Sequence, residues 1–144
     1  MFLRPCNRSV SCLHTAYVLR KEKGFFQLTV FWLLGDQFLK IWHDYYPDDL
    51  IICAKAGLDS LFADADSGRD RHRKMESGVR QKAHARDLKP TAQMDKKKVS
   101  VHVVVFTKWG GFSRRSLVFQ RTAPHRLLVG YSKELVRYDC GWKY

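Results

Sequence analysis

The residues best suited to chemistry are basic and aromatic side chains that alternate in the last third of the chain. Positive charge neutralises phosphates and aromatic faces stack on bases, and single-stranded nucleic acid requires both of a protein. Residues 107–126 interleave the two kinds of side chain, and three consecutive lysines precede them. The predicted nucleic-acid-binding residues are Lys96, Lys97, Lys98, Lys108, Trp109, Phe112, Arg114, Arg115, Arg121 and Arg126.

Period-two alternation separates these arginines if they lie on a strand. Arg115 then shares a face with Leu117, whereas Arg114 points to the opposite side. The arginines form one patch only at a hairpin tip or through the twist of the sheet. In the alternative interpretation, Trp109 and Phe112 pack within a hairpin, and the arginines are solvated edge charges.

An enzyme would have to use a second group, which joins a histidine, two phenols and three carboxylates. General acid–base work and binding of a hard cation both need such side chains. The group lies in one contiguous stretch, and no phosphate loop, dinucleotide fingerprint or nucleophile elbow accompanies it. We therefore predict a non-enzymatic protein without a cofactor. The residues of the enzyme alternative are His43, Asp44, Tyr45, Tyr46, Asp48 and Asp49.

The four cysteines do not form a recognisable pattern. They are too few and too scattered for a disulfide framework in a chain of 144 residues, which makes a reducing compartment the default. The spacing of His43, Cys53, His102 and Cys140 matches no zinc module, so we predict no metal site.

The charge balance suggests a polyanionic partner. The chain carries 26 basic and 14 acidic residues, a formal charge of +12, and residues 69–144 alone carry +13. We expect RNA or another polyanion as the partner, with an acidic protein and plain solubility as alternatives. No membrane span is expected, because the longest apolar run, residues 25–34, is shorter than the roughly 18 residues that a spanning helix needs.

Composition divides the chain into four parts within one domain. Residues 1–24 are a basic N-terminal extension or a transit segment, since no acidic residue precedes Glu22. The protein is expected to be intracellular, and organellar if that segment is a transit peptide. Residues 25–66 form the first half of the domain, and residues 99–144 form a hairpin-rich second half. Residues 67–98 are rich in charge and poor in large apolar side chains, which predicts a disordered basic insertion.

Hydrophobic patterns predict the elements of the first half. The β-branched and aromatic run 25–32 indicates a strand, and residues 36–46 follow with helical spacing. A short buried strand is expected over 50–53 and a helix over 56–66. The six large aromatic residues between 25 and 42 exceed what one strand and one helix easily bury. These aromatic residues suggest two alternative functions: a subunit of a larger assembly, or a small-ligand-binding protein with an apolar pocket.

The second half contains the clearest structural pattern. A valine-rich run from residue 99 and a second apolar run ending near residue 121 flank a Gly-Gly pair, which predicts an antiparallel hairpin over about 99–121. A short strand over 127–129 follows. Together these elements predict an α+β fold, in which a small antiparallel sheet packs on one or two helices.

Overall fold

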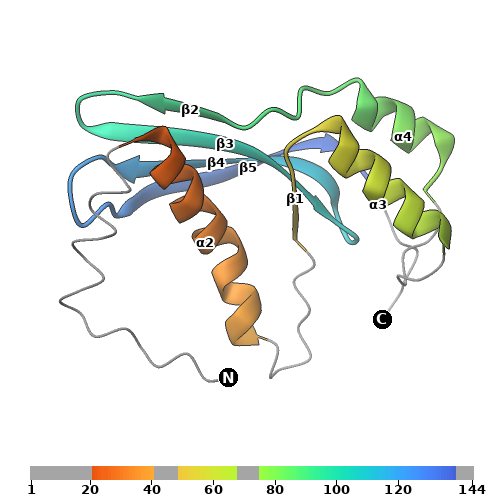
Figure 1. Ribbon diagram of the computed structural model, residues 1–144, viewed down its shortest axis with the longest axis horizontal. Helices are drawn as coiled ribbons and strands as arrows, with labels where there is room; N and C mark the ends of the chain where they lie inside the picture. Colours follow the sequence, from red (N-terminus) through yellow and green to blue (C-terminus); the bar gives the residue numbers. More distant parts are fainter. Residues whose placement is uncertain (1–20, 41–48, 68–74, 139–144) are drawn as a thin grey trace.

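A computed structural model describes residues 21–40, 49–67 and 75–138 (Figure 1). This part of the chain forms a five-stranded antiparallel sheet with three helices, which confirms the predicted α+β class. None of the described helices is long and apolar enough to cross a membrane. The elements are α2 (Glu22–Lys40), β1 (Leu50–Ile52), α3 (Lys55–Ser67), α4 (Ser77–His84), β2 (Thr91–Met94), β3 (Lys98–Thr107), β4 (Gly111–Gln120) and β5 (Leu127–Val136).

The hairpin β3–β4 is the centre of the sheet, as predicted. Its register runs from Lys98 opposite Gln120 to Thr107 opposite Gly111. Valine-rich β3 suits this position because branched side chains pack well on a pleated surface. The turn ends at Gly111, whose φ of 78° lies in the left-handed region that glycine adopts at little cost.

Two short strands share one side of β3, and a long strand completes the other side of the hairpin. β2 pairs with residues 99–102 of β3, and β1 pairs with residues 104–106. β5 pairs with β4 and extends through Gly130 to Val136, well beyond the predicted strand 127–129. Most β5 side chains are exposed, and a strand with no buried face needs no alternation of apolar and polar residues. Its sequence therefore lacked the pattern from which the full length of β5 could be predicted.

Alternate residues of β3 face two separate cores on opposite sides of the sheet. Val99, Val101, Val103 and Val105 pack in one cluster with Phe25 of α2. In the other cluster, Val104 and Phe106 of β3 pack with buried residues of α3 and α4. Figure 1 shows α2 crossing the sheet toward one end of the long strands and α3 and α4 gathered at the other end. We call the side that faces α3 and α4 the second face.

The first described segment corrects one prediction. Residues 25–32 lie in the 19-residue helix α2 and do not form a strand. Phe25 and Thr29 are fully buried, and Leu28 and Leu33 pack partly against the same core, which is the spacing of one helix face. This spacing decides the structure over the β propensity of the individual residues. Of the predicted helix 36–46, residues 36–40 end α2, and the remainder lies outside the described residues.

The basic stretch before β3 is more ordered than its composition suggests. Residues 67–98 were predicted to be a disordered insertion. Of these, the structure describes residues 75–98, which contain α4 and β2. Met75 and Leu88 are buried against the α3 side of the sheet, and Ala83 of α4 lies between them in the sequence. These few apolar side chains are enough to hold the segment in place, because the sheet and α3 already supply the rest of the core that they join. Strand β1 and helix α3 match the predictions for 50–53 and 56–66 to within a residue.

Candidate nucleic-acid interface

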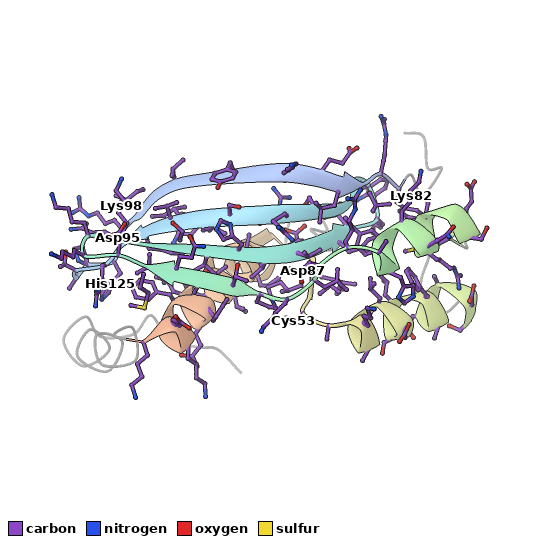
Figure 2. The ribbon with its side chains drawn as sticks, turned by 90° about the horizontal axis from the view of Figure 1, so that it is seen from above. Cys53, Lys82, Asp87, Asp95, Lys98 and His125 are labelled. Carbon is purple, nitrogen blue, oxygen red and sulfur yellow. The ribbon has the colours of Figure 1, made fainter. Side chains whose placement is uncertain are left out.

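The predicted binding residues divide between the two ends of the sheet. Lys96, Lys97 and Lys98 lie at the turn between β2 and β3, and Arg121 and Arg126 lie in the connection between β4 and β5. These two segments meet, because the Arg121 backbone N–H donates to the carbonyl of Lys97 at 2.8 Å. Figure 2 shows Asp95, Lys98 and His125 together at this end and Lys82 far away on α4. We call Lys96, Lys97, Lys98, Arg121 and Arg126 the basic end.

The lysine turn has a defined backbone geometry. Asp95 Oδ1 accepts the backbone N–H groups of Lys97 at 2.7 Å and Lys98 at 2.6 Å. These two bonds, with a smaller effect of the nearby Lys98 and Arg121 charges, lower the pKa of Asp95. One carboxylate oxygen of Asp95 is therefore used by the turn, while all three lysine side chains are exposed.

The facing connection between β4 and β5 is also held by several contacts. Arg121 Nη1 donates to the backbone carbonyl of Asp95 at 2.7 Å, which joins the two turns through a side chain. The Gln120 N–H donates to the Arg126 carbonyl at 2.8 Å, and the His125 ring meets Phe25 edge-on at 5.5 Å between centroids. The start of α2 thus packs against the connection that carries Arg121 and Arg126.

The tip of the β3–β4 hairpin carries a different part of the predicted set. Lys108 Nζ lies 5.2 Å from the ring centre of Trp109, which is partly exposed. Phe112 is only 1% exposed and packs against Phe106 at 4.9 Å, so its ring belongs to the core and offers no face to a base. The ten residues of β3 place this tip about 30 Å from the basic end. The structure therefore does not bring the Trp109 group and the lysine run together.

The two central arginines lie on opposite faces of the sheet, as alternation predicted. Arg114 is opposite Val104 in the register, and Arg115 is opposite Val103. Arg114 Nη2 donates to the carbonyl of Asp87 at 2.9 Å. Within the described part of the chain, the buried Nε of Arg115 has no hydrogen-bond partner. Arg115 is thus on the α2 side, away from the surface that Arg114 shares.

Sequence reasoning missed four residues that the register places beside Arg114 on the second face. β5 contributes Tyr131 and Lys133, β4 contributes Ser116, and β3 contributes His102. Tyr131 is 55% exposed, and His102 Nδ1 lies 2.7 Å from Ser116 Oγ. Only the strand pairing could reveal this group, because its members span 32 positions of the sequence.

The acidic group of the enzyme alternative lies mostly outside the described residues, which include only its last member, Asp49. Cys53 is a free, exposed thiol. Among the residues that the structure describes, no three His, Cys, Asp or Glu side chains are grouped so that they could hold a metal ion.

Helix α2 leaves three consecutive large apolar residues exposed. Phe31 is 73% exposed, Trp32 51% and Val30 39%. Phe31 lies on a side of α2 turned away from Phe25, whereas Trp32, seven residues after Phe25, lies on nearly the same side about two turns farther along the helix. Exposed patches of this type occur at protein contacts, so the subunit alternative stays a hypothesis.

Comparisons with protein-family models, with curated proteins and with solved structures find no match to this chain.

Proposed function

We propose that the protein binds RNA through the basic end, as a binding protein and not as an enzyme. The observation that carries the proposal is the bond from Arg121 Nη1 to the Asp95 carbonyl. It joins two turns that together present five cationic side chains. Because the backbones of the two turns are already held together, binding an anion between them costs less entropy than gathering cations from separate segments would.

The surroundings of the basic end favour an external anion. Lys96, Lys97, Lys98, Arg121 and Arg126 are all exposed, and none of them forms an ion pair within the described residues. The carboxylate beside them, Asp95, accepts two backbone N–H groups. Positive charge therefore accumulates at one end of the sheet, which is the electrostatic footprint of a phosphate-binding surface.

The test is the affinity for a labelled single-stranded RNA over a series of salt concentrations. The variant replaces Lys96, Lys97 and Lys98 with glutamine, and the control replaces Lys55, Lys82 and Lys89, three exposed lysines elsewhere. Both proteins have the same net charge. We expect only the first variant to bind weakly, with a slope of log affinity on log salt that falls by about 0.7 for each lost phosphate contact.

Three results would contradict the proposal. Equal losses in the two variants would mean that net charge and not the basic end attracts RNA. Binding to an acidic polypeptide as tight as binding to RNA would remove RNA as the partner. Wild-type protein that does not bind RNA even at low salt would remove the function itself.

A further inference from the structure

Within the described part of the chain, helices cover only one end of the second face. At the tip of the hairpin, α3 and α4 pack over Phe106, Phe112 and Val136. Toward the basic end the same face carries Tyr131 and Val129, which are 55% and 50% exposed. This uncovered area, which we call the open face, begins where the helices end and continues to Lys98.

The strand register arranges the open face in rows that cross the sheet. One row contains His102, Ser116 and Tyr131, and the next row toward the helices contains Arg114 and Lys133. Toward the basic end follow Ser100, Val118 and Val129, and then Lys98 beside Gln120. Aromatic and apolar surface therefore lies between two groups of cations.

Arg114 and Lys133 form a pair of like charges that a bound anion would stabilise. The two residues lie directly opposite each other on β4 and β5, and like charges in that position destabilise a sheet. Arg114 uses one Nη group on the carbonyl of Asp87, which leaves other N–H donors of its guanidinium available. A phosphate between the two side chains would replace their repulsion with attraction.

The neighbouring row offers a surface for a base. Tyr131 is exposed on an outer strand, so its ring is accessible without any change in the fold. His102 Nδ1 lies 2.7 Å from Ser116 Oγ, and Ser116 is only 3% exposed, so this contact holds the imidazole in the same row as Tyr131. Exposed aromatic rings on a sheet stack unpaired bases, and the faces of paired bases in a duplex are not accessible to them.

We infer that single-stranded RNA lies across the open face, with a base stacked on Tyr131 and phosphates at Arg114, Lys133 and the basic end. This inference rests on the proposed function and specifies its ligand. The six-residue separation of Gln120 and Arg114 along β4 corresponds to about 20 Å, so a few nucleotides span the two cationic groups. Asp87 and Asp95 border the open face, and one carboxylate oxygen of each accepts backbone N–H groups of its own turn.

The experiment compares two substitutions of one side chain, Tyr131→Ala and Tyr131→Phe, with a control, Ser132→Ala, at the adjacent exposed residue on the opposite face. Affinity is measured for single-stranded RNA and for a duplex of the same sequence. We expect the wild type to prefer the single strand and Tyr131→Ala to lose about 5- to 150-fold in affinity for it, the range for one stacked base. Tyr131→Phe and Ser132→Ala should bind within about twofold of the wild type, because stacking requires only the ring.

The outcomes separate this inference from the proposed function. Unchanged binding by Tyr131→Ala, together with weak binding by the lysine-turn variant, would overturn the inference and leave the basic end as an RNA site. Equal affinity for duplex and single strand would also overturn it. If neither variant changes RNA affinity, both proposals are wrong. Thermal melting of each variant verifies that the fold is retained, as expected for a half-exposed tyrosine.

Discussion

Arg121 and Asp95 join the two turns at one end of the sheet, although 26 positions separate them in the sequence. The guanidinium donates to the Asp95 backbone carbonyl, and the Asp95 side chain accepts the amides of the lysine turn. One pair of residues therefore holds together the two turns that carry the cations of the proposed RNA site.

This contact distinguishes Arg121 from Arg126. Both side chains are exposed cations of the basic end, but only Arg121 bonds to the lysine turn. We expect Arg121→Ala to weaken RNA binding more than Arg126→Ala, because it removes both a charge and a contact that orders the turn. Hydrogen exchange of the Lys97 and Lys98 amides should become faster in Arg121→Ala only. Equal affinities and equal exchange rates in the two variants would show that the contact has no role in binding.

Asp95 should make stability depend on pH in the acid range. Two backbone N–H groups stabilise its ionised form in the folded protein, which lowers its pKa from the ordinary 3.8. The contribution to stability is complete above that value and is lost as the pH falls through the lowered pKa. In Asp95→Asn the amide oxygen still accepts hydrogen bonds, so we expect the turn to persist without this pH dependence. Thermal melting of both proteins from neutral to acid pH measures the difference, and parallel curves would contradict it.

The packing of α2 predicts opposite results for two phenylalanines of the same helix. Phe25 is fully buried against Phe119, with ring centres 6.2 Å apart, whereas Phe31 is 73% exposed. We expect Phe25→Ala to reduce the free energy of unfolding by about 3–5 kcal/mol, and Phe31→Ala to change it by less than about 0.5 kcal/mol. Urea denaturation measures both values. Similar losses would mean that residues 25–32 do not pack as a helix with this face inward.

The hairpin turn requires glycine at one position. A Cβ on Gly111 would overlap the carbonyl oxygen of Val136 and the backbone nitrogen of Tyr138, and its φ of 78° also disfavours a side chain. We expect Gly111→Ala to destabilise the protein by more than about 1 kcal/mol. Gly130→Ala is the control, because nothing lies within 4 Å of the added carbon. Chemical denaturation that gives equal stabilities for the two variants would contradict this account of the turn.

An ion pair joins α3 to α4. Arg80 donates through Nη1 and Nη2 to the two carboxylate oxygens of Asp66 at 2.9 and 2.5 Å, and this pairing raises the pKa of Arg80. Both side chains are partly exposed, so we expect Asp66→Ala to cost about 1 kcal/mol at low salt and less at high salt. The control is Asp64→Ala, at an exposed aspartate of the same helix. An Asp66 effect that does not depend on salt would show that the loss has another origin.

Local sequence patterns correctly predicted the elements whose own residues show a clear helix or strand period. The hairpin β3–β4, strand β1 and helix α3 each combine a clear apolar period with turn or helix-end residues. The opposite faces of Arg114 and Arg115 also followed from alternation alone. The composition likewise identified the cations of the basic end, because charge is a property of the residue and not of its position.

Tertiary structure decided which of these residues meet. Helix α2 replaced a predicted strand because packing on the sheet selects the spacing of Phe25 and Thr29 over the β propensity of each residue. Order in residues 75–98 depends on a core that other segments provide, to which Met75 and Leu88 add their side chains. The rows of the open face, with Tyr131 beside Ser116 and Lys133 beside Arg114, arise from strand register. The sequence by itself determined the charge, the central hairpin and the α+β class, and pairing between distant strands determined the surface, because register is set by the packing of the whole sheet.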